Sequence, residues 1–154
     1  MADAWSLLAT TGLAEWMRVS RWGYAAVSAL HVFGIALLVG AVLPLDLRLL
    51  GLWPSVPLVP LVRVLRQVAA TGLAVAVVFG GLLFLAAPAT YASTAVFQAK
   101  MLLVLLGTLS ALWFGVRRDT VTAPRALRRT VAVMSLLCWL PALALGRLVA
   151  FVAE

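Results

Sequence analysis

The sequence is poor in the residues that soluble enzymes use for chemistry. Its 154 residues include one histidine, one cysteine and five acidic residues, and only 11% of the side chains are charged. A single cysteine, Cys138, excludes both a disulfide framework and a Cys-x-x-Cys metal site within one chain. The sequence contains no glycine-rich phosphate loop, no nucleophile elbow and no paired carboxylates. Few residues are therefore left that could carry a reaction.

Acidic residues are absent from the interior of the apolar segments. All of them fall at predicted span ends or at the termini: Asp3, Glu15, Asp46, Asp119 and Glu154. We expect Asp46 and Arg48 to cap and pair locally rather than to catalyse. The start of the chain also lacks the basic region of a cleavable signal peptide, so the first span is expected to direct its own insertion.

Apolar residues are abundant. They make up 65% of the chain, and the mean hydropathy is +1.12. A soluble core of this size could not bury so many apolar side chains, so lipid must act as the solvent. The composition predicts an all-α integral membrane protein with one domain, residues 1–154.

Four apolar runs are each long enough to cross a membrane, since a hydrocarbon core of about 30 Å needs about 20 helical residues. The predicted spans cover residues of about 22–43, 65–86, 97–116 and 131–152. The sequence therefore predicts a four-helix transmembrane bundle. Pro44 is expected to close the first span, residues 88–94 to form a polar connector, and Pro141 to kink the fourth span.

Residues 3–18 are too polar to span a membrane. Their larger apolar side chains share one broad helical face: Trp5, Leu8, Leu13, Trp16 and Met17. This pattern is typical of an amphipathic helix that lies in the membrane interface. A frayed terminus is the alternative.

The basic residues lie at the ends of the apolar spans, and the formal net charge is +7. This distribution indicates membrane orientation rather than a surface for nucleic acid. Most of the arginines follow the first and third spans: Arg48, Arg63, Arg66, Arg117, Arg118, Arg125, Arg128 and Arg129. The positive-inside rule then places these loops in the cytoplasm, with both termini on the outer side of the membrane.

His31 is the only histidine, and it lies inside the first span. An ionisable group at membrane depth is costly and is a candidate functional residue for that reason. Three interpretations remain open: a haem or metal ligand, a proton-relay group, or a histidine satisfied by a neighbouring hydroxyl such as Ser28. Histidine commonly holds haem iron, and a porphyrin fits between the helices of a bundle.

Several other residues are predicted at the same level of the bilayer as His31. Counting about 1.5 Å per helical residue places them in the outer half: Gly80, Gly81, Lys100, Gly107, Gly146 and Arg147. Gly34 is one turn from His31 on the same helical face and would give the ring a smooth surface beside it. Small residues leave room for a flat ligand, although plain helix packing also explains glycines. Arg147 is expected either to snorkel to the interface or to bind a haem propionate or substrate carboxylate, with Lys100 at the same level.

The segment from His31 to Gly51 resembles an uncharacterised bacterial family of four-span inner-membrane proteins, known only as a domain of unknown function. The similarity includes residues 97–101, Trp139 and residues 146–151. More distantly, the Leu30-His31 pair and Lys100 are similar to the HemJ-type protoporphyrinogen oxidases and to CopD-like membrane domains. That resemblance implies that haem b is bound, with His31 as the iron ligand and Lys100 as a polar partner. With one histidine, bis-histidine ligation within one chain is impossible.

The sequence therefore predicts a haem-b-binding inner-membrane protein with a redox or porphyrin-handling role. Two alternatives remain. One is a non-enzymatic accessory subunit whose glycine-rich faces bind a homo-oligomer partner or a larger membrane complex. The other is a small metal or solute transporter in which His31 and Arg147 line a polar path.

Overall fold

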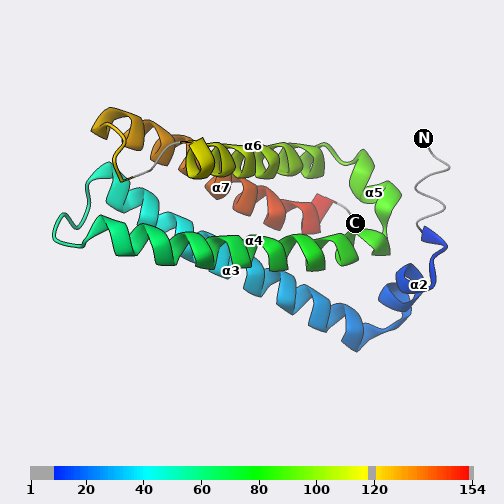
Figure 1. The fold of residues 1–154 in the computed structure, drawn as a ribbon. Helices are drawn as coiled ribbons and strands as arrows, with labels where there is room; N and C mark the ends of the chain where they lie inside the picture. Colours follow the sequence, from blue (N-terminus) through cyan, green and yellow to red (C-terminus); the bar gives the residue numbers. More distant parts are fainter. Residues whose placement is uncertain (1–8, 118–120, 153–154) are drawn as a thin grey trace.

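The computed structural model describes residues 9–117 and 121–152, and these residues form helices joined by short connections. Four long helices dominate: α3 (Arg21–Leu50), α4 (Leu58–Ala86), α6 (Ala95–Arg117) and α7 (Arg125–Val152). Two short helices, α2 (Gly12–Val19) and α5 (Pro88–Ser93), lie at one end of the bundle (Figure 1). This architecture confirms the predicted all-α bundle with four spans.

The long helices are arranged as two hairpins. Helix α3 packs along α4, α6 packs along α7, and the hairpins meet through α3 and α7. In the described part of the chain, the backbones of α4 and α6 do not approach each other closely, and the two helices meet through the stacked rings of Phe84 and Phe97. The α3–α4 and α6–α7 connections lie at the end opposite α2 and α5 (Figure 1), which we call the connection end.

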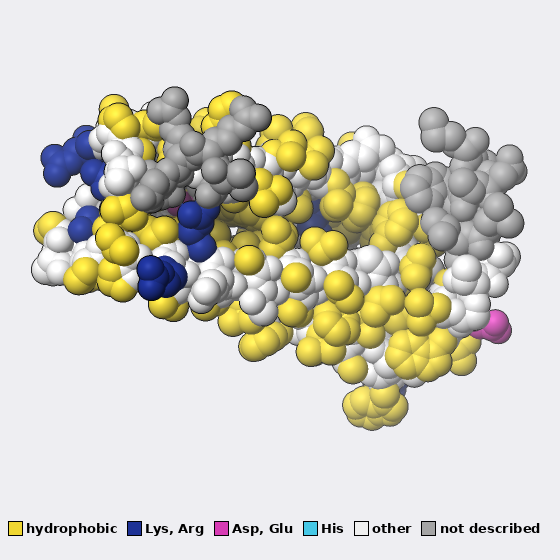
Figure 2. All heavy atoms as spheres, in the orientation of Figure 1, with side chains coloured by type: hydrophobic (Ala, Val, Ile, Leu, Met, Phe, Trp, Pro, Cys, Tyr) yellow, Lys and Arg dark blue, Asp and Glu magenta, His cyan; other side chains and the backbone are white. Residues whose placement is uncertain are grey.

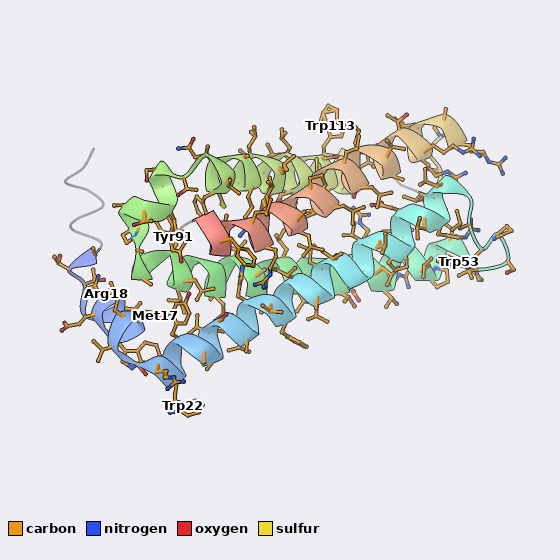
Figure 3. The ribbon with its side chains drawn as sticks, turned by 180° about the vertical axis from the view of Figure 1, so that it is seen from behind. Met17, Arg18, Trp22, Trp53, Tyr91 and Trp113 are labelled. Carbon is orange, nitrogen blue, oxygen red and sulfur yellow. The ribbon has the colours of Figure 1, made fainter. Side chains whose placement is uncertain are left out.

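The exterior of the bundle is apolar. Each long helix contains a candidate span with a hydropathy between 1.8 and 2.4. Yellow apolar side chains cover most of the face in Figure 2, and dark-blue basic side chains gather at the connection end. Trp22 and Trp113 point away from the bundle in Figure 3 and are 85% and 55% exposed. A surface of this kind requires lipid around it, so the chain is a multi-pass membrane protein.

One expectation about proline was wrong. Helix α3 does not close at Pro44 but continues to Leu50. Asp46 and Leu49 are buried beyond the proline, and this packing offsets the backbone hydrogen bond that a proline removes. Helix α4 begins at Leu58 with Pro60 in its first turn, where a missing amide hydrogen leaves no intrahelical bond unmade.

The connector predicted over residues 88–94 was also wrong in part. Residues Pro88–Ser93 form α5, with Pro88 at its first position. Helix α7 runs on through Pro141 as one helix. The structure is therefore more helical than predicted at Pro44 and over residues 88–93, while Pro141 lies inside a helix as the predicted fourth span requires.

Helix α2 is the described part of the predicted interfacial helix, because Trp5 and Leu8 lie outside the described residues. The Thr11 hydroxyl caps α2 by accepting a hydrogen bond of 3.3 Å from the amide of Ala14. Ala14 and Met17 are fully buried, whereas Trp16 remains 47% exposed. One face of α2 thus packs on the bundle, and the other presents an aromatic side chain to the surroundings.

Helices α3 and α4 touch through their backbones at two glycines. A Cβ atom added at Gly34 would lie 2.5 Å from the amide nitrogen of Ala76 and 2.9 Å from the carbonyl oxygen of Gly72. One added at Gly72 would lie 2.5 Å from the amide nitrogen of Leu38. Small residues at both positions allow this close approach. Gly40, in the same helix as Gly34, has nothing within 4 Å of its Cβ position.

We predict that Gly34→Ala or Gly72→Ala lowers the free energy of unfolding by about 1–3 kcal/mol, because the neighbouring backbone atoms cannot move aside cheaply. Unfolding by SDS in detergent micelles, followed by circular dichroism, measures this change. The matched control is Gly40→Ala, which should be neutral or slightly stabilising. An equal decrease in the free energy of unfolding for Gly34→Ala and Gly40→Ala would show that the contact with α4 does not stabilise the protein.

Candidate functional site

The His31 side chain joins α3 to α4 through a hydrogen bond. Its Nδ1 atom lies 2.8 Å from the carbonyl oxygen of Ala76. A carbonyl oxygen can only accept, so Nδ1 carries the hydrogen and donates it. The neutral ring then keeps its lone pair on Nε2. The hydrogen bond goes to the partner helix rather than to Ser28, the nearby hydroxyl considered from the sequence.

Gly80 provides the space in which the imidazole sits. A Cβ atom added at Gly80 would lie 2.7 Å from Cε1 and 3.0 Å from Nδ1 of His31. Gly81, the next residue, has nothing within 4 Å of its Cβ position. Only the first glycine of this pair is therefore needed for the histidine.

Lys100 of α6 lies close enough to His31 for its charge to act on the imidazole. Its aliphatic stem packs on α7, where Cε and Nζ lie 3.6 Å and 3.8 Å from the Cβ position of Gly146. The tertiary structure thus brings together a histidine and a lysine from different hairpins. We call them the His31–Lys100 pair. Figure 2 shows a hollow between the two hairpins with a basic side chain at its back.

An aromatic cluster lies at the α5 end of the bundle, and its members are Tyr24, Phe84, Tyr91 and Phe97. The rings of Phe84 and Phe97 stack with their centroids 5.5 Å apart. Tyr91 lies 5.9 Å from Phe97 and is hydrogen-bonded to Tyr24. Burial raises the pKa of Tyr91 above its ordinary value, and the nearby Tyr24 raises it further. Tyr91 is therefore a neutral phenol at physiological pH.

The aromatic cluster lies on the α5 side of the His31–Lys100 pair. Its members on α3, α4 and α6 lie one or two helical turns from His31, Gly80 and Lys100, respectively. Figure 3 shows Tyr91 at this end of the bundle, between α5 and the ends of the long helices.

The other candidate residues are placed differently. Gly34 lies in the backbone contact with α4 described above. Arg147 is exposed, and its guanidinium carbon lies 4.8 Å from the centroid of the Phe151 ring, which is a cation–π contact along one face of α7. A Cβ atom added at Gly107 would lie 3.0 Å from Cε2 of Trp139. These residues serve helix packing or the helix surface in the structure.

Asp46 differs most from the sequence expectation. It is 4% exposed, and its Oδ2 atom has no hydrogen-bond partner. The carboxyl group of Asp46 forms a hydrogen bond with the Ser135 hydroxyl of α7 and none with Arg48. Arg48 instead donates to the carbonyl oxygens of Val56 and Pro54. The expected pairing of Asp46 with Arg48 was therefore wrong. The burial of Asp46 follows from the continuation of α3 past Pro44, which the sequence analysis did not predict.

The fold and this site define a multi-pass helical membrane protein with a polar pair inside its bundle. Among the residues that the structure describes, no group of three or more His, Cys, Asp and Glu side chains could hold a bare metal ion. Comparison with family models, curated proteins and solved structures found no match.

We predict that the His31 ring is neutral with its proton on Nδ1. Because the chain has one histidine, labelling histidine with ¹⁵N gives the spectrum of this ring alone. The expected result is a protonated Nδ1 and an unprotonated Nε2. Gly80→Ala should change both signals by displacing the ring, whereas Gly81→Ala should leave them in place. An unprotonated Nδ1 in the unmodified chain would contradict the hydrogen bond to Ala76, and hydrogen on both ring nitrogens would contradict the neutral ring.

Proposed function

We propose that this chain is a bacterial inner-membrane protein that binds haem b through Nε2 of His31 and serves a redox or porphyrin-handling role. The observation that carries the proposal is the hydrogen bond from Nδ1 of His31 to the carbonyl oxygen of Ala76. Histidines that ligate metals almost always donate their other ring hydrogen to a carbonyl or carboxylate, which fixes the tautomer and orients the ring.

The donor set fits haem better than a bare ion. A bare transition metal needs several protein ligands, and the described residues offer no such cluster. A porphyrin brings four nitrogen ligands of its own, so a single imidazole completes an axial position. When bound, haem b supplies one-electron redox chemistry at its iron.

The residues of the chain have separate tasks in this proposal. The carbonyl of Ala76 orients His31, and Gly80 leaves room for the ring. The Lys100 ammonium provides a positive charge that can bind a carboxylate such as a propionate. The aromatic cluster excludes water from one side and so strengthens these electrostatic interactions. Arg147, which lies on Phe151, is not assigned to the pocket.

The positive-inside rule gives the orientation in this proposal. Of the described residues, the connection end carries seven arginines: Arg48, Arg63, Arg66, Arg117, Arg125, Arg128 and Arg129. We place this end in the cytoplasm and both termini in the periplasm. The His31–Lys100 pair then lies in the outer half of the bilayer.

The proposal predicts a Soret band in protein purified from cells supplied with haem. His31→Ala should abolish the band while circular dichroism shows the helices intact. Absorption spectra of the two proteins at equal concentration provide the test. The absence of a Soret band from the unmodified protein would refute haem binding.

Two neighbouring glycines offer a matched pair of variants. Gly80→Ala should weaken haem binding by about 10–100-fold, because it displaces an axial histidine from its supporting hydrogen bond. Gly81→Ala adds the same methyl group one residue away and should bind as the unmodified chain does. Titration of the apoprotein with haem measures both affinities. Equal affinities would mean that the orientation of His31 is irrelevant to binding.

A further inference from the structure

The connection end contains a cavity of about 330 Å³ between the end of α3, the α3–α4 connection and the start of α7. Ligand pockets in proteins usually have volumes of about 300–1,000 Å³, so this cavity is large enough for a small group. Four of its lining residues are arginines: Arg48, Arg125, Arg128 and Arg129. We call this cavity the arginine pocket.

The lining of the arginine pocket carries charge of one sign. None of the described residues that line it is acidic. Asp46, two residues from Arg48, is buried and faces Ser135 on the neighbouring helix. Four positive charges around one cavity repel each other, and a bound anion would remove this unfavourable energy.

Arg48 is held in position before any ligand binds. Its Nε donates to the carbonyl oxygen of Val56 at 3.0 Å, and its Nη2 donates to that of Pro54 at 3.1 Å. From the other hairpin, Nη2 of Arg129 reaches to 4.0 Å from the Cβ position of Gly51. Arginines from the two hairpins therefore meet across the α3–α4 connection in a partly fixed arrangement.

Two further features favour a phosphate group. The amino end of α7 begins at Arg125 and adds the positive end of a helix dipole. The rest of the wall includes the apolar side chains of Leu49, Leu50 and Leu58. Arginine matches phosphate oxygens with two parallel hydrogen bonds, and an apolar wall suits the glycerol and upper acyl region of a lipid.

We infer that the arginine pocket binds a phosphate group, presented by an anionic phospholipid headgroup or by a soluble phosphate. The arginine pocket lies at the opposite end of the bundle from the aromatic cluster. The inference does not depend on haem binding at His31.

The test compares two double variants of the full chain in detergent. Arg128→Gln/Arg129→Gln removes two charges from the pocket. Arg63→Gln/Arg66→Gln removes two charges from α4 at the same end, at positions that do not line the pocket. Native mass spectrometry with phosphatidylglycerol or phosphatidylcholine measures lipid binding. Binding of the free anion is measured by comparing thermal stability in inorganic phosphate with that in chloride at equal ionic strength.

We expect phosphatidylglycerol to bind in preference to phosphatidylcholine. The pocket variant should bind it at least about tenfold more weakly, and the α4 variant should bind as the unmodified chain does. Stabilisation by inorganic phosphate without a preference for phosphatidylglycerol would support a soluble ligand at the same pocket. Equal losses in the two double variants would overturn the inference, because the effect would then be one of general surface charge. Binding of neither ligand would also overturn it.

A charge-conserving variant covers the case in which the glutamine pair does not fold. Arg128→Lys/Arg129→Lys keeps the net charge but loses the planar fork of arginine. It should weaken phosphate binding by several-fold while leaving the far-ultraviolet circular dichroism unchanged. Undiminished binding by this variant would contradict recognition by paired hydrogen bonds.

Discussion

The backbone contact between α3 and α4 is the constraint on which the interior of the bundle depends. At Gly34 and Gly72 the two helices approach so closely that a methyl group would meet main-chain atoms. His31 lies one turn from Gly34, and Ala76 lies one turn from Gly72. The close approach therefore brings the carbonyl of Ala76 within 2.8 Å of the imidazole. A wider separation of these helices would leave the ring of a membrane-buried histidine without this partner, at a considerable cost in free energy.

The second hairpin contributes polar groups that the first lacks. The backbone of α6 lies along α7 and not along α4, so Lys100 approaches His31 across the interior of the bundle. At the opposite end, α7 contributes three arginines that meet Arg48 of α3. The polar chemistry of the chain is thus concentrated where the two hairpins face each other. Apolar residues cover the remaining faces, because lipid surrounds them.

Local sequence signals predicted which segments are helical better than they predicted the residues at which the helices begin and end. Proline was one source of error, since α3 contains Pro44 without ending there. In a bundle, tertiary packing on both sides of a proline outweighs one lost hydrogen bond. The same limitation applies to Asp46. Its polar side chain suggested a span end, but the continuation of α3 buries it against Ser135.

The sequence by itself determined the solvent, the number of spans and the residues able to carry chemistry. Hydropathy and helix length decide the first two, and the scarcity of ionisable residues in the apolar runs decides the third. Only the tertiary structure decided that His31 donates to Ala76, that Gly80 holds the ring and that Arg147 lies on Phe151 instead. Such contacts depend on the rotation and separation of helices that are distant in sequence. Those quantities follow from side-chain packing and leave no periodic signal in the chain.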